Sequence, residues 1–237
     1  MTDARVVRIE RLDMAFAPRP WPFAQSRRAE IDAHFARRKA ARPRIFNGEV
    51  LMLYEHAVDG AVFRGSFLKT DYASFISWID WGHPETGVRD CFALGALRSA
   101  DGAFLLGVMG PHTANAGNIY FPCGTPDPSD VKDSAVDLTA NIWRELEEET
   151  GLTAADLGAQ PGWFTVFTGP QIAHLKIMQA REDAVALRAR ILEFMARQDP
   201  PELSDIRIVR GPADLDPMMR PFVVKFLCEQ WPADSAR

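Results

Sequence analysis

The strongest constraint on the fold comes from one acidic segment, which reads Arg144-Glu145-Leu146-Glu147-Glu148-Glu149-Thr150-Gly151-Leu152. On a helix, residues spaced i, i+3 and i+4 share a face, so Glu145, Glu148 and Glu149 gather on one side. A different face carries Leu138, Ile142 and Leu146, which can pack on a sheet. Gly151 stands where a left-handed C-terminal cap is expected. The sequence therefore predicts a helix from about Asp137 to Thr150 with one buried face and one acidic face.

The acidic face is unfavourable for an isolated helix. Like charges four residues apart repel by a few tenths of a kcal/mol. A carboxylate in the last turns also opposes the helix dipole, by roughly 0.3–1 kcal/mol. Arg144 is the only nearby cation. Because hard oxygen ligands favour Mg²⁺ or Mn²⁺, with substrate phosphates completing the shell, we expect a divalent metal ion to neutralise this face.

The segment resembles the signature of the Nudix hydrolases, Gly-x5-Glu-x7-Arg-Glu-U-x-Glu-Glu-x-Gly-U, where U is a bulky aliphatic residue. Every specified position of the second half is matched, by Arg144, Glu145, Leu146, Glu148, Glu149, Gly151 and Leu152. The resemblance implies an α/β fold over about residues 88–231, an α/β/α sandwich with a mixed sheet. It also implies a metal-dependent diphosphatase, in which water attacks one phosphorus of a nucleotide-like small molecule.

The same resemblance assigns roles to four residues of the predicted helix. Glu145, Glu148 and Glu149 would be ligands of Mg²⁺ or Mn²⁺, and one of them could deprotonate the attacking water. Arg144 would orient Glu145 or its neighbours. Many members of the family add a glutamate from a distant loop, for which Glu182 and Glu202 are the candidates here, although each is more simply a solvated loop acid.

The first half of the signature departs from the family. Val136 stands where a glutamate is expected, and Asp137 follows as a stand-in. Asp130 stands at the glycine position. The nearest upstream glycine, Gly124, lies 20 residues before the arginine rather than 14, so the loop is six residues longer, and we place the insertion at residues 126–132. These departures keep an alternative open, a Nudix-fold module that binds a nucleotide without cleaving it.

Substrate choice is less defined by the sequence. Arg89 and Arg98 flank a predicted strand and suit phosphate recognition. Tyr120 and Phe121 are better explained as core than as a stacking platform for a base. The single histidines, His112 and His174, lack the spacing of metal ligands and are expected in a loop or the core.

Two weak resemblances bear on the substrate. The layout of the N-terminal extension, with residues 43–48, is similar to that of the branch that cleaves nucleoside-diphosphate sugars, which we prefer slightly. Residues 116–124 are loosely similar to the approach to the signature in the coenzyme A branch, although Gly107, Val108 and Met109 replace the arginines of that branch. An ADP-ribose diphosphatase is a further alternative.

Composition narrows the class of protein. The net charge of −5 gives no bulk support for binding long nucleic acid. No apolar run reaches the roughly 18 residues of a membrane helix, and the charged N-terminus lacks the apolar core of a secretory signal. Three widely spaced cysteines (Cys91, Cys123 and Cys228) form no CxxC pair, so a reducing cytoplasm is the expected location.

The chain is expected to contain an N-terminal α+β extension, residues 1–86, and a hydrolase domain, residues 87–237. The extension could extend the sheet, fold separately or form a homodimer interface. Its aromatic residues predict that it packs on the hydrolase domain; they are Phe63, Phe67, Tyr72, Phe75, Trp78 and Trp81. Besides the acidic helix, hydrophobic periodicity and turn signals predict strands at 6–11, 50–54, 61–68, 91–98, 103–109, 118–121, 163–167, 172–179 and 206–209, and helices at 24–41, 71–81, 182–197 and 218–231.

Overall fold

The computed structural model describes residues 4–231. The chain divides into two compact units, which are described separately. Unit 1 comprises residues 1–10, 92–124 and 139–237, and unit 2 comprises residues 11–91 and 125–138. Each unit contains residues from both sides of the domain boundary predicted after residue 86. That boundary concerns segments that could fold independently, and it stays a prediction.

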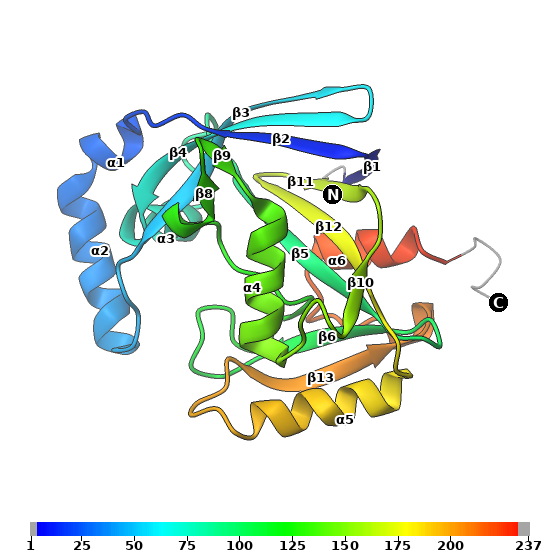
Figure 1. The fold of residues 1–237 in the computed structure, drawn as a ribbon. Helices are drawn as coiled ribbons and strands as arrows, with labels where there is room; N and C mark the ends of the chain where they lie inside the picture. The colour runs from blue at the N-terminus through cyan, green and yellow to red at the C-terminus, as the bar shows by residue number, and fades with distance from the viewer. Residues whose placement is uncertain (1–3, 232–237) are drawn as a thin grey trace. The chain divides into compact units, whose positions relative to one another are not determined.

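Unit 1 is built on an eight-stranded sheet whose main path runs β1-β11-β12-β5-β6-β13, with β10 beside β12 and β7 beside β6 (Figure 1). Every residue of β5 except the last is buried, as expected for a strand covered on both faces. The strands are β1 (Arg5–Ile9), β5 (Asp90–Arg98), β6 (Phe104–Met109), β7 (Ile119–Tyr120), β10 (Leu157–Ala159), β11 (Trp163–Thr168), β12 (Gln171–Ala180) and β13 (Leu203–Val209).

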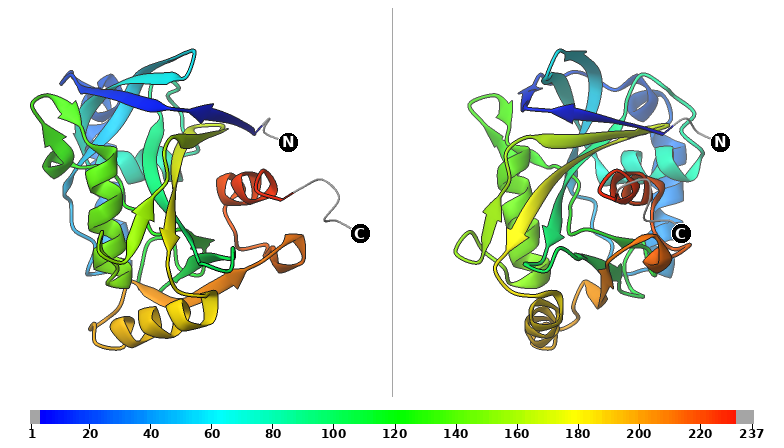
Figure 2. Two further views of the ribbon diagram at one scale, coloured as in Figure 1. Left: turned by 45° about the vertical axis from the view of Figure 1, so that its right-hand side comes forward. Right: turned by 90° about the vertical axis from the view of Figure 1, so that its right-hand side faces the viewer.

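Helices α4 (Leu138–Thr150) and α6 (Pro221–Cys228) cover opposite faces of this sheet (Figure 2). Successive side chains of a strand alternate between faces, so Phe92 and Gly95 of β5 point to opposite sides. Gly95 meets the apolar face of α4, and the ring of Phe92 packs edge-on against Phe222 of α6 at 5.2 Å between ring centroids. Helix α5 (Ala184–Met195) runs beside β13. The predicted α/β class and sandwich architecture are confirmed.

Unit 2 contains a five-stranded mixed sheet in the order β3-β4-β2-β9-β8. Strand β2 (Arg11–Phe16) pairs in parallel with β4 (Val62–Asp71), whereas β3 (Glu49–Asp59) pairs with β4 in an antiparallel hairpin. Gly60, in the turn of that hairpin, has a φ of 58°, a conformation that an Asp-Gly dipeptide accepts in a tight turn. Two short strands, β8 (Val131–Lys132) and β9 (Ala135–Val136), complete the sheet.

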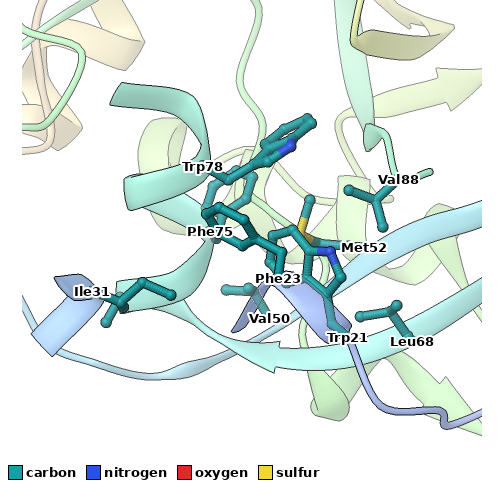
Figure 3. Packing of buried hydrophobic residues seen from close by; sticks show 10 residues of the cluster. Trp21, Phe23, Ile31, Val50, Met52, Leu68, Phe75, Trp78 and Val88 are labelled. Atoms are coloured by element: carbon teal, nitrogen blue, oxygen red, sulfur yellow. The ribbon is translucent and has the colours of Figure 1, made fainter. Parts of the chain in front are cut away.

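The core of unit 2 is rich in aromatic residues (Figure 3). It joins β3 and β4 to three helices, α1 (Pro22–Ser26), α2 (Arg28–Ala41) and α3 (Tyr72–Asp80). Trp21 packs against Phe23 and Trp78, and Phe75 belongs to the same cluster, with Tyr72 and Trp81 packed around it. Four of the six aromatic residues that were expected to pack on the hydrolase domain therefore contribute to the core of unit 2 itself. The packing of the extension on the hydrolase domain stays a prediction.

Several predicted elements need correction. The single strand expected over residues 6–11 is two strands: β1 ends at Ile9, β2 begins at Arg11, and the two join different sheets. The expected helix over residues 24–41 is broken at Arg27, where the backbone leaves helical geometry. The last helix is shorter than predicted, because it begins at Pro221, whose fixed φ suits a first helical turn. Strands β2, β8, β9 and β10 were not predicted.

The remaining predicted elements agree with the structure to within a few residues. Between residues 4 and 231, no helix combines the length and the apolar character that crossing a membrane would require.

Candidate active site

Helix α4 is held against the sheet by its apolar face. Ile142 and Leu146 are fully buried, and Leu138 is nearly so. A Cβ atom added to Gly95 of β5 would lie 2.9 Å from Leu146 Cδ1 and 3.2 Å from Ile142 Cγ2, closer than van der Waals contact permits. Glycine at this strand position therefore lets the helix approach the sheet. That packing also fixes the direction of the acidic residues, of which Glu145 and Glu149 are buried beside the apolar face and Glu148 is exposed.

The C-terminal end of α4 is closed by three contacts. Gly151 has a φ of 71° and its N–H donates to the carbonyl of Glu147 at 3.0 Å, as predicted for a glycine cap. The ring of Phe194 in α5 occupies the space beside Gly151, where a Cβ would come within 2.5 Å. Gln198 Nε2 donates to the carbonyl of Glu148 at 2.7 Å. The last turn, which carries the acidic residues, is therefore firmly positioned.

Arg144 is the cation that serves the acidic face. Its Nη1 lies 2.6 Å from Glu145 Oε1 and 3.5 Å from Glu148 Oε2. Glu145 is buried, with 8% of its surface exposed, whereas the Glu148 side chain is 60% exposed. The structure therefore places the guanidinium beside two of the three carboxylates.

Glu149 is the most unusual residue of this face. It is 3% exposed, and neither carboxylate oxygen accepts a hydrogen bond of standard geometry. Burial raises the pKa of Glu149 well above its ordinary value, and the negative charges of Glu202, Glu145 and Glu148 raise it further; the backbone N–H of Cys123 lies close enough to oppose this shift in part. A buried carboxylate without partners destabilises a fold unless it is protonated or a cation binds to it.

The loop at residues 123–124 lies against the acidic residues of α4. A Cβ on Gly124 would lie only 2.1 Å from Glu145 Oε1 and 2.4 Å from Glu145 Cδ. Any side chain at position 124 would therefore displace Glu145. Together with the Cys123 N–H beside Glu149, this close approach makes residues 123–124 one wall of the site.

Glu202 joins the acidic group from a distant part of the chain. It immediately precedes β13, and its carbonyl accepts a hydrogen bond from the N–H of Gly110 at 2.8 Å, just after β6. Burial raises the pKa of Glu202, the charge of His112 lowers it, and Glu148 raises it. The imidazole of His112 covers Gly110, where a Cβ would lie 3.0 Å from its Cε1. Of the two candidate extra glutamates, Glu202 is therefore the one near the acidic face.

Glu182, the other candidate, takes part in a separate ion-pair group. Arg190 of α5 lies 2.9 Å from Glu182 Oε1 and 2.5 Å from Asp156 Oδ1. Glu182, in the segment before α5, and Asp156, in the loop before β10, are therefore joined through Arg190 of α5.

The residues considered for substrate choice divide into core and loop. Phe121 is fully buried among the rings of Phe104 and Phe226, and His174 is buried beside Thr165, with 2.8 Å between Nδ1 and Oγ1. The interpretation of Phe121 and His174 as core residues is confirmed.

Arg89, Arg98 and Tyr120 each contact other groups of the protein. Arg89 Nη1 donates to the carbonyls of Thr86 and Val88, at 2.6 and 2.9 Å, so its guanidinium supports its own loop. The guanidinium of Arg98 lies 5.8 Å from the ring centroid of Phe104. Tyr120 is buried, and its hydroxyl accepts a hydrogen bond from Asn115 at 3.3 Å.

The degenerate first half of the motif forms a hairpin. Residues 131–136 make β8 and β9, joined by Asp133 and Ser134, whose φ angles of 49° and 65° are those of a two-residue hairpin turn. Val136 is buried in this hairpin, and Asp137 lies 3.3 Å from Lys132 Nζ. Asp130 is buried and accepts from the N–H of Asp127. Residues 131–136 thus add two strands to the sheet of unit 2.

No three His, Cys, Asp or Glu side chains within residues 4–231 stand in the arrangement of a preformed metal centre. A cavity of about 620 Å³ belongs to unit 2 and is lined by β2, β3, β4 and the turn between β8 and β9, and none of the predicted site residues lines it.

Comparison with known proteins gives likenesses among solved structures. No protein-family model matches the chain, and no curated protein matches it. Among the solved structures, the chain is similar to a Nudix hydrolase from M. smegmatis, RenU, with 18% identity over 59% of this chain and 80% of that chain, and a TM-score of 0.38.

Proposed function

We propose that this chain is a metal-dependent hydrolase that cleaves the diphosphate linkage of a nucleotide-like small molecule, with Mg²⁺ or Mn²⁺ as its ion. The observation that carries the proposal is Glu149, a carboxylate almost wholly buried, without hydrogen-bond partners and close to three other acidic groups. A divalent cation is the partner whose charge and preference for oxygen ligands fit that environment.

The acidic face supplies the proposed ligands. Glu145, Glu148 and Glu149 would hold the ion, and Arg144 keeps Glu145 and Glu148 turned toward the same side of the helix. When bound, the ion polarises phosphoryl oxygens, lowers the pKa of water and stabilises the leaving group. The packing of α4 on Gly95 supports the proposal, because it gives the ligands a rigid base before any substrate binds.

For the general base we propose Glu202. It lies within electrostatic range of Glu148 and Glu149 yet comes from a different element, so it can face the substrate from another side. A base must be able to accept a proton near the working pH, and burial raises the pKa of Glu202 in that direction.

The substrate class follows from the sequence resemblance alone. A nucleoside-diphosphate sugar is our first choice, with coenzyme A and ADP-ribose as alternatives. A homodimer and a cytoplasmic location stay predictions from the sequence.

A nucleotide-binding module without turnover is the second candidate, and one observation favours it. Val136 is buried in a hairpin where the family carries a glutamate, so part of the usual support of the arginine is replaced. Such a module would retain the acidic face and bind its ligand without hydrolysis.

Product release from a panel of nucleoside-diphosphate sugars, ADP-ribose, dinucleotides and coenzyme A tests the proposal. Mg²⁺-dependent turnover that is lost in Glu148→Gln and kept in Glu147→Gln supports a hydrolase, because Glu147 is an exposed residue of the same helix outside the acidic face. Tight binding of one compound with no turnover of any supports the module.

Calorimetry with Mn²⁺ separates both candidates from an acidic helix that binds no ion. A heat of binding present in the wild-type protein and reduced in Glu149→Gln supports the metal site. Equal heats in the two proteins would contradict the proposed metal site and therefore the proposed hydrolase.

A further inference from the structure

The cavity of about 620 Å³ in unit 2 lies apart from the residues assigned to the proposed reaction. Its walls come only from unit 2, from strands β2, β3 and β4 and from the turn between β8 and β9. Small-molecule binding sites have volumes of roughly 300–1,000 Å³. The cavity is therefore large enough to hold an organic ligand.

The floor of the cavity is a strip of residues that crosses four neighbouring strands. Strand pairing sets them opposite one another in the order Glu55, Ser66, Ala15 and Ala135. Residues that face each other on adjacent strands point to the same side of a sheet, so these four side chains line one strip. Because three of the four are alanine or serine, the strip leaves open space above the sheet.

The cavity begins where the aromatic core of unit 2 ends. Ser66 and Leu68 lie two residues apart on β4 and therefore point to the same side of the sheet. Leu68 is buried in the aromatic core, which Figure 3 shows, whereas Ser66 is half-buried and lines the cavity. Ala15 is exposed, so a ligand can reach the strip from solvent.

The charged groups that line the cavity are unevenly paired. Arg64 lies 2.7 Å from Asp59 and 3.8 Å from Asp13. Glu55 and Asp133, by contrast, form no ion pair with any residue between positions 4 and 231. Three carboxylates and one guanidinium therefore line the cavity, and their summed charge attracts a cation.

The two unpaired carboxylates belong to opposite ends of the strip. Glu55 is its end residue on β3, and Asp133 lies in the turn that leads to Ala135 at the other end. The N–H of Phe16 donates to the carbonyl of Ser134 at 2.8 Å, which holds this turn beside β2. Three strand spacings separate the ends of the strip by roughly 14 Å. One metal ion cannot contact two carboxylates this far apart, whereas an elongated molecule with a positive charge at each end can.

We propose that the cavity binds a linear aliphatic polyamine, a chain of methylene groups that carries protonated amines. One terminal ammonium group donates to Glu55 and the other to Asp133, and the Ser66 hydroxyl accepts from an amine between them. The methylene groups lie on the methyl groups of Ala15 and Ala57. The inference concerns unit 2 alone and is independent of the proposed hydrolase.

Calorimetry with spermine on the full-length protein provides the test. The wild-type protein should bind one equivalent in the cavity. Glu55→Gln and Asp133→Asn should each weaken binding about fivefold or more, because each removes one contact between opposite charges. Glu147→Gln is the matched control, since it removes the same charge from an exposed position of α4 in unit 1. That control should change the affinity less than about twofold, because salt screens a distant surface charge.

Ala15→Leu tests the shape of the cavity separately from its charge. The larger side chain fills the middle of the strip while both carboxylates remain, so spermine affinity should fall about fivefold or more. Position 15 is exposed, so the substitution should not prevent folding, which thermal unfolding checks. Ala57→Leu, which is also exposed and lines the same cavity, is a second variant with the same expected loss.

Three results would overturn the inference. The first is folded wild-type protein that does not bind spermine. The second is an equal loss in Glu55→Gln and Glu147→Gln, because spermine would then bind the acidic surface in general. The third is an unchanged affinity in both folded leucine variants, because the ligand would then lie outside the cavity.

Manganese affinity, measured on the same cavity variants, separates this inference from the proposed function. It should be unchanged in Glu55→Gln and Asp133→Asn, because none of the proposed metal ligands lines the cavity. Loss of spermine binding in these variants of a protein that does not bind Mn²⁺ would overturn the hydrolase and keep the polyamine site.

Discussion

Replacing Glu149 with glutamine should stabilise the metal-free protein at neutral pH. The wild-type carboxyl is buried without partners, so in the absence of an ion it is held protonated, while in the unfolded chain it ionises with an ordinary pKa of 4.5. Glutamine has a similar shape and no charge, and it removes this difference between the folded and unfolded states.

The size of the effect follows from proton linkage. A group whose pKa is raised on folding stabilises the protein fully below its unfolded pKa, and that contribution is lost as the pH rises toward the folded pKa. For Glu149 the loss begins above pH 4.5 and grows by no more than about 1.4 kcal/mol per pH unit, so it cannot exceed about 3.4 kcal/mol at pH 7. Glu149→Gln should therefore equal the wild-type protein near pH 4 and exceed it increasingly toward pH 7.

Urea unfolding in EDTA across this pH range measures the difference, with Glu147→Gln as the control from the exposed side of the same helix. Saturating Mn²⁺ should reduce or reverse the difference in the free energy of unfolding between the two proteins. An ion at about 100 times its dissociation constant adds roughly 2.7 kcal/mol to the free energy of unfolding of the protein that binds it. A free energy of unfolding that is no higher for Glu149→Gln at any pH, or a difference that does not grow with pH, would refute the reasoning.

Three further predictions concern the candidate site and the stability of the fold. Gly124→Ala should lower Mn²⁺ affinity about tenfold or more in calorimetry, because its Cβ would displace Glu145, whereas Gly211→Ala, with no atom within 4 Å of the added Cβ, should not change it. Ile142→Ala should lower the free energy of unfolding by about 2–4 kcal/mol in urea titrations, because the Ile142 side chain is fully buried on the face of α4 that packs on the sheet. Asp71→Ala should cost about 1–2 kcal/mol at pH 7, since this side chain caps α3 by accepting from the Ser74 N–H. Burial raises the pKa of Asp71, but hydrogen bonds from Ser74 lower it below 3.8 overall, so this difference should shrink in acid as the wild-type carboxyl is protonated.

The positive charge of the α2 region is partly paired within unit 2. Arg27 and Arg28 of the α2 region are paired with Glu30 and Asp32, and Arg38 lies 3.4 Å from Asp80. Exposed pairs of this kind add little to stability.

The sequence alone determined the helix that carries the candidate site. Its apolar residues recur with helical spacing, its acidic residues share another face, and Gly151 marks its end; each of these signals lies within 15 residues, where local geometry decides the structure. Most strands of unit 1 and the β3–β4 hairpin of unit 2 were predicted for the same reason, although β10 was missed.

Tertiary structure decided which distant segments meet. The run from Arg5 to Phe16 has one hydrophobic pattern but serves two sheets, and the pairing of β1 with β11 and of β2 with β4 depends on partners far along the chain. The same holds for Glu202, whose surroundings at residues 110 and 149 are set by the pairing of β6 with β13. A periodic hydrophobic pattern predicts which face of a strand each residue occupies. It does not predict which strand lies beside that strand, because packing across the whole sheet decides the pairing.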